Sequence, residues 1–483
     1  MACALSIRPT RRRFLQGSLA ASLCSAGSPP AFGSVDSASG FGLTAGAARI
    51  PLVGDGYPET DVWAFNGHVP GPVIRATQGS MLTIDVANEL AEPTTVHWHG
   101  LRVPVGMDGV PYLSQPPIEP GDSFSYAFQL EDAGTYWYHP HINSSEQVGR
   151  GLYGALIVEE AEPPIVDREL LWVLDDWRLD QEAAITPFGN RHDQSHGGKI
   201  GNSATVNGRI PDLEKVRAGE RIRLRLINAA NARIFSLDFR DLAPWVIALD
   251  GQPVQPHRPD QAGLALAPGM RADLIVDMTG EPGSESQVVD GHYGPDRAYE
   301  LIRFSYDAAS PLREPLGGTE SEPPAALAPN PIGEPDLAAA ERHRLVFEGG
   351  AMGGMAQAMM GGRMLDIREL AERGRLWAIN GRVPDEVHRE PPLLEARAGT
   401  TQLIEMVNRT AFEHPIHLHG HVFRVISRNG EKAAHQPWRD TVLLGLDETI
   451  EIAFVADNPG RWMFHCHVLE HQGAGMMGIV AVV

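Results

Sequence analysis

The stretch Trp377-Ala378-Ile379-Asn380-Gly381 begins a pattern that occurs three times along the chain. In this copy Pro384 and Gly399 follow the Asn-Gly step, and Asn408 lies nine residues after Gly399. The other two copies contain Trp63-Ala64-Phe65-Asn66-Gly67, Pro70, Gly79 and Asn88, and then Asn207-Gly208, Pro211, Gly219 and Asn228. The Asn-Gly steps lie 141 and 173 residues apart, which is too far for stacked solenoid repeats and suits duplicated domains.

Between the glycine and the last asparagine of each copy, apolar and polar residues alternate, as in residues 221–227 and 402–407. Alternation with a period of two over six or seven residues indicates a half-buried strand. Such strands recur at the spacing that is typical of β-sandwiches. The sequence therefore predicts an all-β chain of three β-sandwich domains in tandem.

Composition marks the domain boundaries, because stretches rich in Pro, Ala and Glu are typical of linkers. We place the first domain at residues 46–160, the second at 165–307, a linker at 308–340 and the third domain at 341–483. Helix is scarce, and the clearest candidate covers residues 366–373.

The N-terminus resembles a twin-arginine export signal, with Arg11, Arg12 and Arg13 ahead of a short apolar run from residue 17 to residue 26. We assign residues 1–45 to this signal and a linker, and predict a periplasmic or secreted protein that uses the twin-arginine translocase. Cys3 and Cys24 lie in the signal, so the mature chain has one thiol, Cys466, and no internal disulfide.

The net charge of −21 excludes a basic surface for nucleic acid, and no later apolar stretch approaches the roughly 20 residues of a membrane span. We therefore expect neither nucleic acid nor a membrane among its partners.

Histidine pairs with one residue between them are unusually frequent. A chain with 19 His in 483 residues would contain about one such pair by chance, and this one has five. On a strand, each pair directs both imidazoles to one face, as ligands of one metal or of adjacent metals require. The pairs are 97/99 and 139/141 in the first repeat and 417/419, 419/421 and 465/467 in the third. We expect a metal cluster where the first and third domains meet, with the second domain as a spacer.

The C-terminal stretch His465-Cys466-His467 is followed by His471 and Met476. A thiolate, an imidazole and a thioether at this spacing suit a blue-copper site if a second His arrives from elsewhere, with His414, His417, His419 and His421 as candidates. Because side chains alternate along a strand, Cys466 would face one metal while its two His neighbours face another. One strand would then connect two metal sites.

These motifs resemble the four signatures of the multicopper oxidases, and the resemblance covers essentially the whole mature chain. It implies cupredoxin-like Greek-key domains and four copper ions, one of type 1, one of type 2 and two of type 3. By position, it implies type 1 ligands His414, Cys466, His471 and Met476; type 2 ligands His97 and His417; and type 3 ligands His99, His139 and His467 for one ion and His141, His419 and His465 for the other. Cys466 is thus also the electron-transfer residue. The resemblance implies reduction of O2 to water.

Several nearby residues have weaker assignments. The resemblance gives Asp108 a role in proton supply, although an ordinary Asp-Gly turn is the alternative. Gln472 stands where related bacterial enzymes often have a proton-relaying glutamate, and Glu470 is a substitute that the sequence does not decide. We interpret His421 as a core or supporting residue and prefer Met476 to Met477. The remaining histidines, including His192 and His196, lie in loop-like sequence and are expected in solvent.

The electron donor is the open question. A phenol or another small aromatic donor such as an aromatic amine is the first candidate, and Cu(I) is the second. Residues 351–364 contain five methionines, which select Cu(I) or simply pack as a helix, but four glycines favour an adaptable loop. Phe412 and Glu413 precede His414, where cuprous oxidases tend to carry Asp and Met. A non-catalytic copper carrier or cell-division protein is a remote alternative, since every expected ligand is present.

Overall fold

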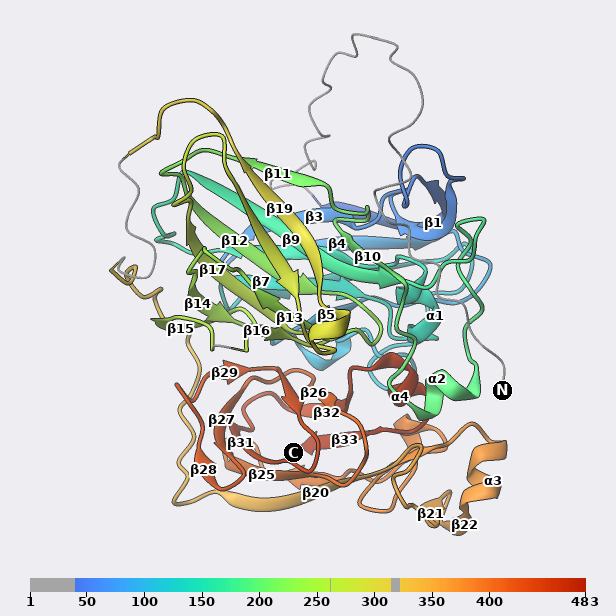
Figure 1. Ribbon diagram of the computed structural model, residues 1–483. Coiled ribbons are helices and arrows are strands. Elements are labelled where there is room, and N and C mark those ends of the chain that lie inside the picture. Colours follow the sequence, from blue (N-terminus) through green and yellow to red (C-terminus); the bar gives the residue numbers. More distant parts are fainter. Residues whose placement is uncertain (1–39, 261, 314–321) are drawn as a thin grey trace. The chain divides into compact units, whose positions relative to one another are not determined.

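The computed structural model describes residues 40–260, 262–313 and 322–483 (Figure 1). The predicted twin-arginine signal lies outside these residues, as do Cys3 and Cys24. Within the described part, no helix is both long and apolar enough to cross a bilayer. The cysteine in this part, Cys466, is a buried free thiol.

Strands dominate the described chain and form a pair of sheets in each third of the sequence. The first domain has the strand orders β2-β1-β4-β6 and β3-β8-β7-β5. Its strands are β1 Phe41–Ile50, β2 Thr60–Phe65, β3 Gly71–Thr77, β4 Met81–Asn88, β5 His97–His99, β6 Ser123–Gln129, β7 Gly134–His139 and β8 Gly154–Glu159. Strand β1 begins ahead of residue 46, the domain start that we placed from the sequence.

The second domain has the strand orders β10-β9-β12-β17-β14-β15 and β11-β19-β18-β13-β16. Its strands are β9 Arg168–Trp177, β10 Ser203–Val206, β11 Leu213–Val216, β12 Arg221–Asn228, β13 Phe235–Asp238, β14 Trp245–Leu249, β15 Gln252–His257, β16 Leu264–Leu266, β17 Arg271–Asp277, β18 Glu285–Asp290 and β19 Tyr299–Tyr306.

The third domain has the orders β23-β20-β25-β31-β27-β28, with β29 also paired to β27, and β24-β33-β32-β26-β30, besides the hairpin β21-β22. Its strands are β20 Glu341–Gly349, β21 Gln357–Met360, β22 Arg363–Asp366, β23 Trp377–Ile379, β24 Leu394–Ala396, β25 Thr401–Asn408, β26 His414–Leu418, β27 Phe423–Arg428, β28 Glu431–Lys432, β29 Trp438–Arg439, β30 Thr441–Leu444, β31 Thr449–Val455, β32 Gly460–Cys466 and β33 Met477–Val482.

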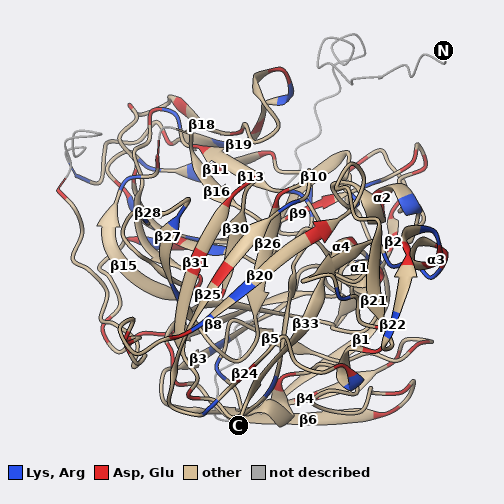
Figure 2. Ribbon diagram, turned by 90° about the horizontal axis from the view of Figure 1, so that it is seen from below, with Lys and Arg blue, Asp and Glu red and all other residues tan. Residues whose placement is uncertain are grey.

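The three domains share one strand arrangement. The pairs β1 with β4, β9 with β12 and β20 with β25 are parallel, and so are β3 with β8, β11 with β19 and β24 with β33. Each domain has its own apolar core. The chain therefore consists of three cupredoxin-like β-sandwiches, as the sequence predicted. Lys and Arg are interspersed with Asp and Glu over the strands and loops (Figure 2).

The asparagine of each Asn-Gly step explains why this pattern repeats. Asn66, Asn207 and Asn380 have φ values of 54°, 53° and 52°, which Asn adopts more readily than most residues. Each side-chain carbonyl accepts from a strand amide and each side-chain amide donates to a carbonyl two residues earlier on that strand, as Asn207 does with Val173 N and Leu171 O, both at 2.8 Å. The repeated turn thus anchors itself to the first strand of each domain.

The second asparagine of each copy organises the loop after the central strand. Asn228 is fully buried, donates to Arg233 O (2.8 Å) and Leu266 O (2.7 Å), and accepts from Ala230 N (2.9 Å). Asn88 and Asn408 make the corresponding three contacts in the other domains.

Strand β12 departs from the half-buried strand that its alternation predicted. Arg223 and Arg225 are only 1% and 0% exposed, because the polar face of β12 faces other charged groups rather than water. Asp273 accepts from both guanidinium groups at 2.6 and 2.9 Å, and Thr135 of the first domain donates to the same carboxylate at 2.6 Å. The alternation correctly predicted a strand, but the polar side chains of this strand lie in a contact between two domains and not in solvent.

Helices are short: α1 Ser144–Gly149, α2 Arg191–Ser195, α3 Ile367–Glu372 and α4 Leu469–Gly473, with 3-10 turns at Val105–Met107, Pro295–Arg297 and Val387–Arg389. Helix α3 confirms the predicted helix, and Asp366 and Glu369 form a capping box at its start. The methionine-rich segment is neither a helix nor only a loop. It contains the hairpin β21-β22, in which Met359 pairs with Met364 and Gly361 and Gly362 form the turn.

We expect Asn228→Ala to lower the free energy of unfolding by about 2–3 kcal/mol, because two buried carbonyls and one amide lose their partners. Asn380→Ala is the matched control, since Asn380 makes similar bonds, at 2.7 and 2.9 Å, but at an exposed site where water replaces them. The thermal midpoint of unfolding measures both variants. Equal shifts would contradict a special role for the buried asparagine.

Candidate metal centres

Cys466, His414 and His471 form a compact group, which we call the thiol cluster. Cys466 Sγ lies 3.5 Å from His414 Nδ1 and 3.7 Å from His471 Nδ1, and the two nitrogens are 3.2 Å apart. All three side chains are fully buried. Met476 is also buried, and its backbone bonds to both Cys466 N (3.0 Å) and His471 O (2.9 Å).

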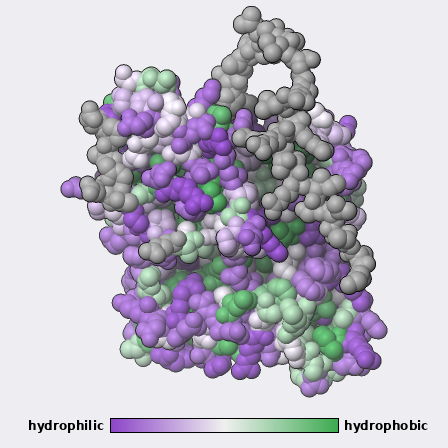
Figure 3. Space-filling model, in the orientation of Figure 1, coloured by the Kyte–Doolittle hydropathy of each residue, from purple (hydrophilic) through white to green (hydrophobic). Residues whose placement is uncertain are grey.

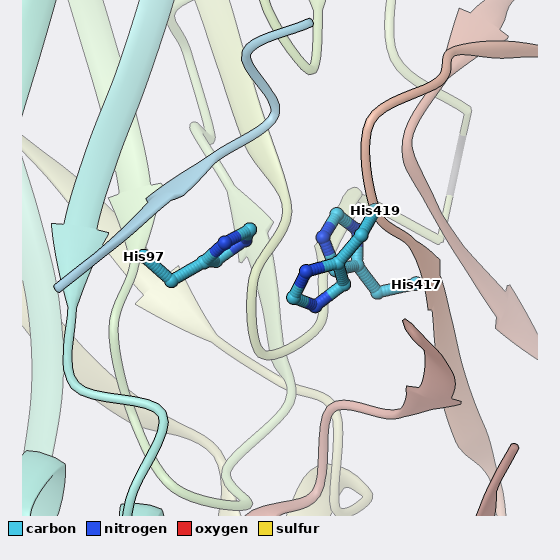
Figure 4. A group of neighbouring side chains, drawn as sticks. All are labelled: His97, His417 and His419. Atoms are coloured by element: carbon cyan, nitrogen blue, oxygen red, sulfur yellow. The ribbon is translucent and has the colours of Figure 1, made fainter. Parts of the chain in front are cut away.

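Eight histidines from the first and third domains form a second group, the histidine cluster: His97, His99, His139, His141, His417, His419, His465 and His467. Candidate ligand atoms of His97, His417 and His419 lie within 4.8 Å of one another, and those of His141, His419 and His465 do likewise. Figure 4 shows the imidazoles of His97, His417 and His419 meeting from opposite sides of this region. The ring of His467 lies 4.9 Å from that of His99 and 5.3 Å from that of His139.

Strand register explains why the two clusters are neighbours. Strand β26 pairs with β32 so that His417 lies opposite His465 and Ile416 opposite Cys466. In the first domain β5 pairs with β7, which places His97 opposite His139. Since side chains alternate on a strand, Cys466 enters the core of the third domain while His465 and His467 enter the histidine cluster.

The ring nitrogens of the histidine cluster divide into two kinds. One nitrogen of most rings has a protein partner, as in His97 Nδ1 with Asp108 O (2.8 Å), His139 Nδ1 with Pro140 O (2.9 Å) and His465 Nδ1 with Cys466 O (2.9 Å). The opposite nitrogens are buried and have no hydrogen-bond partner among the described residues: His97 Nε2, His99 Nδ1, His139 Nε2, His141 Nε2, His417 Nε2 and both nitrogens of His467. Buried polar atoms without partners are costly, and a shared set of imidazole acceptors fits a transition metal.

Burial also sets the protonation of these groups. It lowers the pKa of His99, His139, His141, His419, His465 and His467 well below the ordinary value, and that of His471 to about 4. These imidazoles are therefore neutral, the form that binds metals. Burial raises the pKa of the Cys466 thiol, so a bound cation would have to displace its proton.

Asp440 joins the histidine cluster to the second domain, and sequence reasoning missed it. Its Oδ1 accepts from His99 Nε2 (3.1 Å), its backbone carbonyl accepts from His417 Nδ1 (2.9 Å), and Arg271 donates to both carboxylate oxygens at 2.8 and 2.6 Å. Burial would raise the pKa of Asp440, but Arg271 and the His417 bond outweigh it and hold that pKa well below its usual range. The ionised carboxylate directs the N–H of His99 to Nε2 and leaves Nδ1 as the ligand atom.

Gly100 directly follows the pair His97/His99, and the contact between Arg271 and Asp440 requires a glycine at this position. Its φ is +90°, and a Cβ at this position would lie 2.2 Å from Arg271 Nη2 and 2.6 Å from Asp440 Oδ2. The glycine lets the guanidinium of the second domain reach the cluster.

Asp108 lies against the histidine cluster. It is 1% exposed, and its Oδ2 accepts from His419 Nδ1 at 2.9 Å, while His97 Nδ1 lies 3.3 Å from its Oδ1. Gln472 Nε2 is 3.4 Å from His141 Nδ1, and both residues line a pocket of about 220 Å³. Glu470 instead bonds Asn231 of the second domain at 3.1 Å and is not part of that lining, so it is a poor substitute for a glutamate at position 472.

The other histidines are less uniform than expected. His421 packs against the rings of Phe454 and Trp462, in agreement with a core role. His292 pairs with Glu413 at 3.0 Å, and His257 stacks on His435. His192 lies on α2 with its side chain 76% exposed, as expected, whereas His196, the residue that follows α2, accepts through its carbonyl from His471.

Comparisons with known proteins agree with this architecture. Three family models described as multicopper oxidase match residues 48–163, 168–286 and 363–483. Multicopper oxidase MmcO of Mycobacterium tuberculosis is 32% identical over 472 residues, covering 90% of this chain and 85% of that protein. Copper resistance protein A of Escherichia coli is 27% identical over 572 residues, with 92% of each chain covered.

A solved structure, the laccase-like multicopper oxidase CueO from the lignin-degrading bacterium Ochrobactrum sp., is 27% identical with a TM-score of 0.76 and covers 93% of this chain and 99% of that chain. Three cupredoxin-like domains with buried imidazole and thiol clusters define a copper-dependent oxidoreductase. This chain belongs to the multicopper oxidase family, whose members use O2 and a reducing substrate.

We expect Arg271→Met to lower the amount of copper that the histidine cluster holds, because Asp440 loses its counter-ion and no longer fixes His99. Breaking a buried pair typically costs about 3–5 kcal/mol. The blue colour of copper bound to Cys466 should persist, since Arg271 does not contact the thiol cluster. Elemental analysis and electron paramagnetic resonance measure the two sites. Arg303→Met is the control on β19, and full copper content in folded Arg271→Met would contradict the role.

Proposed function

We propose that the protein binds four coppers and couples four one-electron oxidations of a donor to reduction of O2 to two waters. The type 1 ligands are His414, Cys466, His471 and Met476. The type 2 ligands are His97 and His417, and the type 3 ligands are His99, His139 and His467 for one ion and His141, His419 and His465 for the other. The buried ring nitrogens without a hydrogen-bond partner support this assignment, because a nitrogen that is neither hydrated nor hydrogen-bonded is available to a metal ion.

Copper supplies the redox chemistry when bound, and the chain provides the route between the two clusters. Cys466 is covalently joined to His465 and His467, and His465 Nδ1 also donates to Cys466 O at 2.9 Å. An electron accepted beside Cys466 can therefore reach the histidine cluster through the backbone or through one hydrogen bond. Asp108 and Asp440 hold the imidazoles in place from outside.

Cu(I) is the donor that the geometry supports best. The single observation that carries this proposal is the cover over His471, which has no exposed surface. Its Nε2 donates to the carbonyl of His196, and the ring of Trp377 lies 4.2 Å from its own ring. An aromatic donor therefore has no direct access to the imidazole of His471. A metal ion bound nearby can pass an electron through the groups that cover His471. This cover supports Cu(I), which the sequence analysis gave as the second candidate.

The methionine hairpin supports the same donor. Met359 and Met364 lie directly opposite each other on β21 and β22 and are 39% and 53% exposed. Directly paired residues have Cβ atoms about 5 Å apart, so two thioethers can hold one soft ion. Apolar side chains are exposed on this part of the third domain (Figure 3). Copper resistance protein A, a relative by sequence, carries copper resistance in its name.

Aromatic donors are the second candidate. Phe412 is partly buried beside the thiol cluster, its ring 5.9 Å from those of both Trp377 and His196, and offers an apolar edge to a phenol or an aromatic amine. The Ochrobactrum structure is described as having oxidase activity towards lignin model compounds. Either donor fits a periplasmic enzyme exported by the twin-arginine translocase, which the N-terminal sequence supports.

Replacing Met359 and Met364 together with Leu should raise the KM for Cu(I) by about tenfold, because bulk is kept and the sulfur ligands are lost. Met360→Leu is the matched control, since Met360 lies on the same hairpin but is 6% exposed. Oxygen uptake with Cu(I) and with a phenol measures both variants and the wild type. Absent Cu(I)-dependent uptake by fully loaded wild type would refute Cu(I) as the donor.

Asp108→Asn should slow reoxidation of the enzyme by O2 by at least about tenfold and leave reduction of the blue copper by donor nearly unchanged. An asparagine side chain can still accept from His419 Nδ1, but it cannot take up and release a proton as the carboxylate does. Stopped-flow absorption separates the two half-reactions. Equal slowing of both would instead indicate that this turn serves folding.

A further inference from the structure

The end of α2, a helix of the second domain, closes the outer side of the thiol cluster. Three consecutive carbonyls accept hydrogen bonds from the third domain: Gln194 O from Trp377 Nε1 (2.7 Å), Ser195 O from Ala351 N (2.7 Å) and His196 O from His471 Nε2. The last carbonyls of a helix have no partner within it, so these contacts satisfy both elements. The helix end is fixed on the cluster.

Two histidine side chains lie at this end of α2. His192 and His196 are four residues apart, so they share one face, and their rings stack with centroids 4.0 Å apart and planes within 7°. The side chain of His192 is 76% exposed, and His196 is partly exposed. Nδ1 of His196 lies 2.9 Å from Ser195 Oγ, and no described residue bonds its Nε2. Both rings can therefore turn nitrogens toward a ligand from solvent.

Met352 is adjacent in sequence to the residue that bonds this helix end. It follows Ala351, whose amide is bonded to Ser195 O, and it is 82% exposed. Its φ is +64°, which is an unusual and strained value for a side chain of this kind. A large apolar side chain that is both strained and exposed is not explained by packing.

The route from these imidazoles to the cluster is short. The carbonyl that accepts from His471 belongs to His196 itself. A path from the His196 ring to the His471 ring therefore consists of the covalent bonds within His196 and one hydrogen bond. A donor held at His196 would be coupled to the thiol cluster without touching any cluster residue.

We infer that His192 and His196, together with the thioether of Met352, form the docking site for the donor Cu(I). Imidazoles suit copper, and a thioether is a soft ligand that selects Cu(I) over harder cations. Each docked Cu(I) gives up one electron, which passes through His196 to the type 1 centre, and leaves as Cu(II). Four such ions reduce one O2 with four protons. The inference rests on the proposed function, and it names a site apart from the methionine hairpin.

Binding and turnover of the fully copper-loaded enzyme test this site. Ag(I) serves as the redox-inert probe, titrated by calorimetry against the wild type, His192→Asn/His196→Asn and the control His257→Asn/His435→Asn, which removes a stacked histidine pair outside both clusters. The substitution keeps the carbonyl of residue 196, so the bond to His471 remains. We expect the first variant to lose about tenfold or more in Ag(I) affinity and in kcat/KM for Cu(I), with phenol oxidation and blue colour unchanged. The control should match the wild type.

The outcomes separate the two proposals. A wild type that does not oxidise Cu(I) refutes the proposed donor. A wild type that oxidises Cu(I) while the α2 variant keeps its Ag(I) affinity and its Cu(I) kinetics refutes the docking site alone. Loss of the blue colour or of phenol oxidation in the α2 variant would make the pair a structural support of the thiol cluster, which also refutes docking.

Discussion

The buried ion pair between Arg271 and Asp440 is the constraint on which the histidine cluster depends. Both groups have no exposed surface, and each alone would be an unpaired charge in the interior. Arg271 also donates to Thr135 O of the first domain at 3.2 Å, so one guanidinium contacts the other two domains. Among its described residues, the second domain supplies no member of the thiol cluster or the histidine cluster, yet it fixes the hydrogen bonds of His99 and His417. It is therefore part of the site and not only the spacer that the sequence suggested.

A wider set of buried charges holds the first and second domains together. Arg225 lies between Asp273 (2.9 Å) and Glu169 (2.8 Å), and Arg223 between Asp273 and Glu160. Burial would raise the pKa of Asp273, but Arg225 and Arg223 outweigh it and lower that pKa. Such a network is costly when any member is missing, so it favours one relative placement of the domains. The first domain's four cluster histidines are thereby held where the third domain can complete the site.

The sequence predicted features that depend on local periodicity and could not predict contacts between domains. Strand alternation and paired histidines follow from the period of a strand, so the fold, the cluster histidines and Cys466 were found from their spacing. Asp440, Arg271 and the carbonyl of His196 belong to no repeat, and their roles arise only when strands more than 100 residues apart meet. The alternation of β12 was read correctly as a strand, but its arginines face Asp273 instead of solvent. The glycines of the methionine segment correctly argued against a helix, but the predicted loop contains a hairpin, because Gly361 and Gly362 favour a tight turn between two strands.

Helix α4 carries two neighbouring residues whose side chains enter different surroundings. His471 and Gln472 are adjacent on this helix, where successive side chains point about 100° apart. His471 enters the thiol cluster and bonds to the helix end that carries His192 and His196, whereas Gln472 lines the pocket that reaches His141. One helical turn therefore contacts both the thiol cluster and this pocket. Gln472 cannot exchange a proton as a carboxylate does. Two described carboxylates contact the histidine cluster. Asp440 is held ionised by Arg271, whereas Asp108 has no arginine partner and is the better candidate for proton exchange.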